Sequence, residues 1–254
     1  MNLDMKLRLD EILVARGHCE SRSQAQRMIM EGKVRVKGVT APKAGNKYDS
    51  EIELELAEEN KFVSRGGLKL EGAFNEWGFD VTGFSCLDVG ASTGGFTDCL
   101  LQHGAARVVA VDVGHSQIHP RLLQDPRVIS IEKFNARNMT PADLPFVPDF
   151  AVCDVSFISL RLILPPMMNV LKNGGEMVTL IKPQFEAGRE QVGKGGVVRD
   201  EAVRLQVVQS IREFGESIGL EWLGYCTSPI TGPAGNVEYT ARWRKPLAQN
   251  TPEQ

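Results

Sequence analysis

A glycine-rich turn between an apolar segment and a helical segment is the part of this chain best suited to bind a ligand. Residues 87–89 have the pattern of a buried strand, residues 90–95 form the turn, and residues 108–111 resemble a second strand that ends at Asp112. A unit of strand, turn, helix and strand binds its ligand beyond the carboxyl ends of its strands. The pattern therefore predicts a nucleotide-binding site here.

The composition of the turn narrows the choice of ligand. A dinucleotide turn needs a glycine where this chain has Ser92, because the backbone must approach a pyrophosphate closely. The spacing Gly90-x-x-x-Gly94-Gly95, preceded by Asp88, suits a ligand with an amino-acid tail and no phosphate, such as S-adenosylmethionine. An ordinary tight turn with a surface acid is the alternative. We expect Asp112 to accept hydrogen bonds from the ribose hydroxyls of the ligand. The full set of predicted cofactor-binding residues is Asp88, Gly90, Ser92, Thr93, Gly94, Gly95, Phe96, Asp112, Val113, Asn135, Ala136 and Asp154.

Charged residues follow two further predicted strands. Residues 150–153 and 176–181 are apolar, and Asp154 and Lys182 come directly after them. Since the carboxyl ends of parallel strands meet at one edge of a sheet, these side chains are expected to converge with Asp112. An ammonium beside a hydroxyl favours the developing alkoxide, and a carboxylate can hold that ammonium in place. The cluster fits methyl transfer from a sulfonium to an alcohol.

Composition describes a globular protein of 254 residues with 42% apolar and 24% charged residues. We expect it to be cytoplasmic, because no apolar run approaches the roughly 20 residues that span a bilayer and the start lacks a signal-peptide core. The five cysteines are widely spaced, which favours reduced thiols, and we expect no structural metal. We expect a monomer, although the sequence leaves the oligomeric state open.

The first 48 residues form a basic segment, with ten Lys or Arg against five Asp or Glu, and residues 49–59 hold six acids and no base. Apolar residues at helical spacing predict two short helices, around residues 9–16 and 22–31, with Ser21 as the cap of the second. Alternating residues at 34–38 and 51–56 predict two half-exposed strands. Charge alone fits either a solvated surface or an RNA-binding module.

The order Arg-Leu-Asp-x-x-Leu, Ser-Arg-x-x-Ala and Gly-x-Val-x-Val-x-Gly over residues 6–58 resembles the S4-type RNA-binding domain. Such domains are thought to lay their helix pair against structured RNA. The resemblance implies phosphate contacts by the basic residues Arg8, Arg22, Lys33, Arg35 and Lys37. For each of them, a surface cation without a partner is the alternative.

Five separated blocks carry a second resemblance, which covers most of residues 60–245. They are Ser-Arg-Gly-Gly-Leu-Lys-Leu at 64–70, the turn at 88–97, Asp-Val-Ser-Phe-Ile-Ser at 154–159, Lys-Pro-Gln-Phe-Glu at 182–186, and Ser-Pro-Ile at 228–230 with Gly-Asn-Val-Glu at 235–238. Together they resemble the TlyA, or haemolysin A, group of FtsJ-like methyltransferases. The family's Lys-Asp-Lys-Glu set falls on Lys69, Asp154, Lys182 and Glu238, and Lys182 is implied to assist deprotonation.

The resemblance implies an α/β fold, with a Rossmann-like S-adenosylmethionine-dependent methyltransferase domain behind a small N-terminal α+β RNA-binding domain. It implies 2′-O-methylation of ribosomal RNA, at cytidines of the small or large ribosomal subunit or both. The predicted boundaries are an RNA-binding domain at 1–59, a linker at 60–63, a methyltransferase domain at 64–246 and a disordered tail at 247–254. In the linker, Phe62 could relay RNA contact to the donor site, but a core position sealing the junction is the preferred interpretation.

Three other functions are alternatives. A pore-forming haemolysin lacks support from any membrane-spanning run, and a dinucleotide-dependent oxidoreductase is disfavoured by Ser92. A non-catalytic ribosome-binding factor with the same fold stays open.

Four further features were interpreted individually. A P-loop-like segment at 188–195 lacks the Ser or Thr that would hold magnesium, so we predict a loop near the RNA with Lys194 and Arg199 as phosphate contacts. Arg65 is a further predicted RNA contact. His115 and His119 are predicted loop residues rather than a metal pair. Phe157 and Phe185 fit either base stacking or core packing.

Overall fold

The protein divides into two compact units, Met1–Asn60 and Lys61–Gln254, which we call the N-terminal and C-terminal units. The computed structural model describes residues 6–41, 43–56 and 61–248. Residue 60 of the predicted linker and residues 249–254 of the predicted tail lie outside the described residues. Phe62 is 2% exposed and packs in a core of the C-terminal unit, in agreement with the core interpretation of this residue.

The N-terminal unit combines a helix pair with short strands. Its elements are β1 (Leu7–Arg8), α1 (Leu9–Ala15), α2 (Arg22–Met30), β2 (Val34–Val36), β3 (Val39–Thr40), β4 (Lys47–Tyr48) and β5 (Leu54–Leu56). Both predicted helices are confirmed, and the Ser21 hydroxyl caps α2 by accepting from the amide of Gln24 at 3.3 Å. Strand β2 pairs antiparallel with β3 and β5, and β1 pairs with β4. The buried side chains of Leu9, Leu13 and Ile29 form the small core of this unit.

The C-terminal unit is an α/β domain built on one seven-stranded sheet. Its strands are β6 (Ser85–Val89), β7 (Arg107–Val111), β8 (Val128–Ile131), β9 (Phe150–Cys153), β10 (Glu176–Ile181), β11 (Glu221–Thr227) and β12 (Tyr239–Arg244). Its α-helices are α3 (Gly66–Trp77), α4 (Gly95–Gln102), α5 (Pro120–Leu123), α6 (Leu164–Val170), α7 (Pro183–Glu186) and α8 (Glu201–Ser217). Short 3₁₀ turns occupy Ala136–Asn138, Pro141–Asp143, Leu160–Leu162 and Arg189–Gln191.

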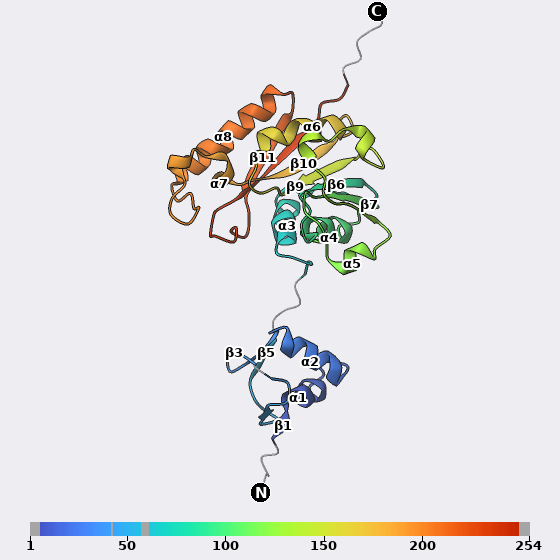
Figure 1. Ribbon diagram of the computed structural model, residues 1–254, viewed down its shortest axis with the longest axis vertical. Coiled ribbons are helices and arrows are strands. Elements are labelled where there is room, and N and C mark those ends of the chain that lie inside the picture. Colours follow the sequence, from blue (N-terminus) through green and yellow to red (C-terminus); the bar gives the residue numbers. More distant parts are fainter. Residues whose placement is uncertain (1–5, 42, 57–60, 249–254) are drawn as a thin grey trace, which may run out of the picture. The chain divides into compact units, whose positions relative to one another are not determined.

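The sheet runs in the order β11-β12-β10-β9-β6-β7-β8. Strands β6 to β10 are parallel, and β12 inserts antiparallel between β10 and β11. Helices α3, α4 and α5 cover one face, while α6 and α8 cover the other (Figure 1). Successive strand residues therefore enter different cores: Leu87 belongs to the cluster that contains α8 residues, and Cys86 belongs to the cluster that contains α3 and α4 residues. This burial on both faces explains the continuous apolar runs of the sequence.

The chain reverses its direction of winding between two neighbouring strands. From β6 it proceeds outward through β7 and β8, and it then returns to place β9 on the other side of β6. Ligands of open parallel sheets bind outside the carboxyl ends of the strands at such a switch point. Asp112, Asp154 and Lys182 directly follow β7, β9 and β10 at this edge, as predicted.

All five cysteines are free thiols, in agreement with the prediction from their spacing. Within residues 6–41, 43–56 and 61–248, no helix combines the length and apolar character that crossing a bilayer demands.

One carboxyl group lies in the interior of the sheet. Asp88 on β6 is 1% exposed, and its Oδ2 accepts a hydrogen bond from the Thr97 hydroxyl at 2.7 Å. Its Oδ1 has no partner among the residues that the structure describes. Burial raises the pKa of Asp88 from 3.8 to about 7. The folded state therefore keeps a proton that the unfolded state has already lost above about pH 4.

This shift predicts a pH-dependent stability that Asp88→Asn removes. The free energy of unfolding of the wild-type C-terminal unit should fall as the pH rises to about 7 and then level off, because only the folded state must give up a tightly held proton. Relative to Asp88→Asn, we expect a loss of about 3 kcal/mol between about pH 5 and pH 8. Urea unfolding followed by tryptophan fluorescence measures it, since Trp77, Trp222 and Trp243 all lie in this unit. If the free energies of unfolding of the two proteins changed in parallel with pH, the raised pKa of Asp88 would be contradicted.

Candidate active site

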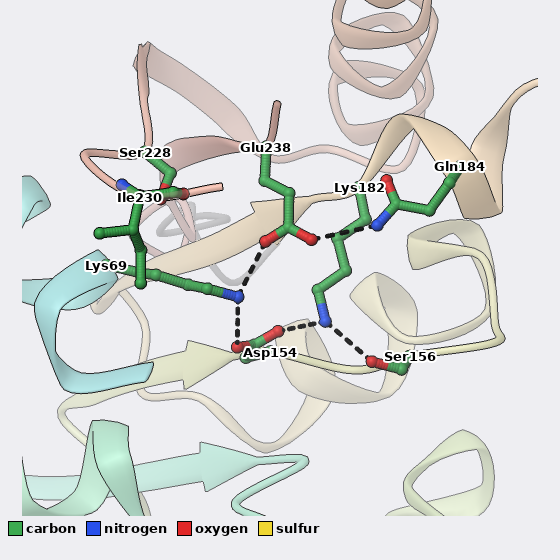
Figure 2. A network of polar contacts seen from close by, with 8 residues as sticks. All are labelled: Lys69, Asp154, Ser156, Lys182, Gln184, Ser228, Ile230 and Glu238. Atoms are coloured by element: carbon green, nitrogen blue, oxygen red, sulfur yellow. Dashed lines mark hydrogen bonds and ion pairs between the residues drawn. The ribbon is translucent and has the colours of Figure 1, made fainter. Parts of the chain in front are cut away.

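Two amines and two carboxylates form a connected chain of ion pairs in the C-terminal unit (Figure 2). Lys69 Nζ lies 2.8 Å from Glu238 Oε2 and 3.3 Å from Asp154 Oδ2. Lys182 Nζ lies 2.5 Å from Asp154 Oδ1. The structure therefore brings together all four residues of the predicted catalytic set. We call this cluster the tetrad.

Four separate elements supply the tetrad. Lys69 projects from α3, Asp154 follows β9, and Lys182 follows β10. Glu238 precedes β12. Because β12 runs antiparallel to β10, its first residue lies at the same sheet edge as the last residue of β10, with Tyr239 opposite Ile181.

The tetrad is shielded from water. The side chains of Lys69, Lys182 and Glu238 are 10%, 8% and 1% exposed, and that of Asp154 is 18% exposed. Charged groups this buried are stable only when they are paired and hydrogen-bonded. In the tetrad each amine contacts a carboxylate and each carboxylate contacts an amine, so every charge has a counter-charge.

Two polar side chains hold the ends of the tetrad. The Lys182 amine donates to the Ser156 hydroxyl at 2.9 Å, and the Gln184 amide donates to Glu238 Oε1 at 3.0 Å (Figure 2). Neither Ser156 nor Gln184 is among the residues predicted from the sequence to form the site. Both stand inside the blocks at 154–159 and 182–186 that carried the family resemblance, which was the available signal.

The tetrad lines a cavity of about 710 Å³, together with residues of the glycine-rich turn. Gly90 has φ +80°, and a Cβ there would lie 2.9 Å from the carbonyl oxygen of Asp154. Gly94 has φ +93°, and a Cβ there would lie 2.3 Å from the Leu122 side chain. Glycine is therefore required at both positions, and the turn presents its backbone to the cavity. Gly90, Ser92, Thr93, Gly95 and Phe96 line the cavity, whereas the predicted residues Gly94 and Asp88 do not.

Asp112 holds the backbone beside the turn. One carboxylate oxygen accepts from the amide of Ser92 at 2.8 Å, and the other accepts from the amide of Gly114 at 2.7 Å. Its own carbonyl accepts from the amide of Phe134 at 2.9 Å, which brings the segment containing Asn135 and Ala136 next to Val113. Val113, Asn135, Ala136 and Asp112 itself are not among the lining residues of the cavity, so they form an adjoining patch.

Two aromatic side chains stand at the cavity. Phe157 is 90% exposed and has φ +63°, and its ring centroid lies 5.0 Å from that of Phe185. Both residues line the cavity. The core-packing alternative for Phe157 is therefore wrong, whereas Phe185 is half-buried.

The predicted RNA contacts fall into two groups. Arg8 donates two hydrogen bonds of 2.9 Å to the fully buried Asp10, Arg22 lies 3.5 Å from Asp10, and Lys33 lies 2.6 Å from Glu31. Arg35, Lys37, Arg65 and Lys194 are exposed and form no ion pair with any residue in the described ranges. Arg65 lines the cavity.

The two histidines hold loop structure, in agreement with their interpretation as loop residues. His115 Nδ1 lies 2.5 Å from a carboxylate oxygen of Glu132, and His119 Nδ1 accepts from the amide of Arg121 at the start of α5. No cluster of three metal-binding side chains occurs in the described part of the chain.

Comparison with known proteins assigns the family. The pattern of FtsJ-like methyltransferases matches residues 62–245, and that of the S4 domain matches residues 7–48. A Mycobacterium tuberculosis protein named 16S/23S rRNA (cytidine-2'-O)-methyltransferase TlyA is 44% identical over 92% of this chain and 88% of its own length. Hemolysin A of Brachyspira hyodysenteriae is 45% identical over 93% of this chain and 99% of its own length.

A solved structure from Streptococcus thermophilus, classed by name with the hemolysins, shares 44% identity and a TM-score of 0.74. It covers 96% of this chain, and the match spans 90% of that protein. The predicted fold class and both family resemblances are confirmed. The chain belongs to the FtsJ-like methyltransferase family and carries an S4 domain in its N-terminal unit.

Proposed function

We propose that this protein is an S-adenosylmethionine-dependent 2′-O-methyltransferase that acts on a cytidine ribose of ribosomal RNA in the cytoplasm. The observation that carries the proposal is the tetrad, which lines the same cavity as the glycine-rich turn. The relative from Mycobacterium tuberculosis is named for this reaction on cytidine, and the S4 domain supports an RNA substrate.

The residues around the turn fit the proposed donor. Gly90 lines the cavity without a side chain, which leaves room for the methionine part of S-adenosylmethionine, whereas Gly94 is required by its packing against Leu122. Asp112, directly after β7, would accept from the ribose hydroxyls, and Val113, Asn135 and Ala136 beside it would complete the donor site. Asp88 supports the turn from behind, with one oxygen unpartnered among the described residues. When bound, S-adenosylmethionine supplies a methyl group made electrophilic by its sulfonium.

The tetrad supplies what the acceptor needs. A ribose hydroxyl is almost entirely protonated at neutral pH, so its oxygen must be stabilised as its proton passes to a base, for which the Asp154 carboxylate stands beside the Lys182 amine. The Lys182 ammonium can stabilise that negative charge electrostatically in a site shielded from water. Asp154 and Ser156 fix the position of the amine, while Lys69 and Glu238 balance and orient Asp154. Positioning of the sugar supplies much of the remaining acceleration.

Lys182→Ala tests the catalytic assignment. With labelled S-adenosylmethionine and ribosomal subunits, we expect the rate of methyl transfer to fall at least about 100-fold, because the charge that stabilises the oxygen is lost. Donor and RNA binding should persist. Lys172→Ala is the matched control, since Lys172 pairs with Asp149 at the opposite edge of the sheet. Transfer by Lys182→Ala at the wild-type rate would refute the role of Lys182, and absence of transfer by the wild type to either subunit would refute the proposed function.

Asp112→Asn tests the donor assignment. The substitution removes an acceptor for ribose hydroxyls and for one of the two backbone amides, so we expect the Kd for S-adenosylmethionine to rise about 10-fold, equivalent to about 1.4 kcal/mol. Titration calorimetry measures the change, with Asp143→Asn on the 3₁₀ turn Pro141–Asp143 as the control. Unchanged affinity in Asp112→Asn, or tighter binding of a nicotinamide dinucleotide than of S-adenosylmethionine, would count against this site.

A further inference from the structure

The loop that joins α7 to α8 contributes one wall of the cavity. We call residues 193–199 of this connection the glycine loop. Gly193 donates its amide to the carbonyl of Val197 at 3.1 Å, which closes a tight hairpin whose tip is Lys194-Gly195-Gly196. Gly195 and Gly196 line the cavity with φ of +80° and +75°. A Cβ at either glycine would meet nothing within 4 Å, so these residues are required by backbone conformation and leave the hairpin open to an incoming group.

A buried asparagine just before β12 holds the glycine loop by two hydrogen bonds. Asn236 is 2% exposed, its amide nitrogen donates to the carbonyl of Gly196 at 2.9 Å, and its amide oxygen accepts from the amide of Val198 at 3.0 Å. The amide group of asparagine supplies a donor and an acceptor on separate atoms, and both are used here. Asn236 stands two residues before Glu238, so the loop is held in register with the tetrad.

The glycine loop carries positive charge that nothing in the described chain neutralises. Lys194 and Arg199 are exposed and form no ion pair with any described residue. The guanidinium of Arg199 lies against the hairpin, 3.3 Å from where a Cβ of Gly193 would stand. The amides of Lys194 and Gly195 donate to no acceptor in the described ranges. By contrast, the charges of the tetrad balance one another.

Backbone amides at a glycine tip, flanked by Lys and Arg, are the groups that bind phosphate. In RNA the 2′-oxygen stands on the carbon next to the one that carries the 3′-phosphate. A ribose that presents its 2′-oxygen to Lys182 therefore brings a phosphodiester into the same cavity. We propose that the glycine loop, fastened by Asn236, binds the phosphodiester that adjoins the target ribose. This inference rests on the proposed function and adds the group that positions the RNA backbone.

The double variant Lys194→Gln/Arg199→Gln tests the proposal in the full-length protein. With ribosomal subunits as substrate, we expect the KM for RNA to rise at least about 10-fold, because phosphate contacts contribute binding that depends on salt. The slope of log KM against log salt concentration should decrease by about 1, because one phosphate contact is lost. The Kd for S-adenosylmethionine should stay at the wild-type value. Lys172→Gln/Arg212→Gln is the control, since it removes the same charge at other surfaces of this unit.

Asn236→Leu tests the two hydrogen bonds of Asn236 without changing charge. The leucine has a similar size but neither donates to Gly196 nor accepts from Val198, so we expect a higher KM for RNA with little change in the affinity for S-adenosylmethionine. Tryptophan fluorescence checks that the variant is folded.

A KM for RNA equal to that of the control double variant would overturn the proposal. So would a loss of S-adenosylmethionine affinity with an unchanged KM for RNA, since the loop would then hold the donor's carboxylate. Failure of the proposed function is distinguishable, because it requires that the wild type itself methylates no ribosomal RNA.

Discussion

The pairing of buried charges in the tetrad is the constraint on which the catalytic unit depends. Glu238 is 1% exposed and Lys69 is 10% exposed, so removing either partner leaves an uncompensated charge in the interior, at a typical cost of about 3–5 kcal/mol. The pairs form only if α3, β9, β10 and the start of β12 keep their mutual positions. The same arrangement that stabilises the charges holds the Lys182 amine at the cavity wall.

The sheet topology explains why one cavity can serve a donor and an acceptor. The reversal of winding between β6 and β9 opens space at their carboxyl ends, where the glycine-rich turn contributes backbone without side chains. Because β12 runs antiparallel to β10, the residues that precede it, Asn236 and Glu238, lie at the edge where the parallel strands end. Two hydrogen bonds of Asn236 hold the glycine loop at the same edge, so the proposed donor-binding and RNA-binding elements lie on one sheet edge.

Much of this architecture could be predicted from sequence, and the exceptions have physical causes. The parallel strands were recognisable because both faces of the sheet are buried, and Asp154 and Lys182 followed from strand ends alone. Lys69 and Glu238 were reached only through the family resemblance, because neither a helix face nor the start of an inserted antiparallel strand marks a site in the sequence. For Arg8 the resemblance implied an RNA contact, but the structure shows that two of its hydrogen bonds go to the buried carboxylate of Asp10, two residues further along the chain. The sequence did not reveal this pairing, because the burial of Asp10 depends on the folded structure.

The most direct test of the account is a double-mutant cycle on the single-turnover rate of methyl transfer, using Lys69→Met, Glu238→Gln and the combined variant. If the tetrad acts as one unit, the combined variant should lose no more rate than the worse single variant, within about threefold, because removing both partners strands no charge. If the two losses instead multiply, the side chains act independently, and the ion-pair chain is not the organising feature of this site.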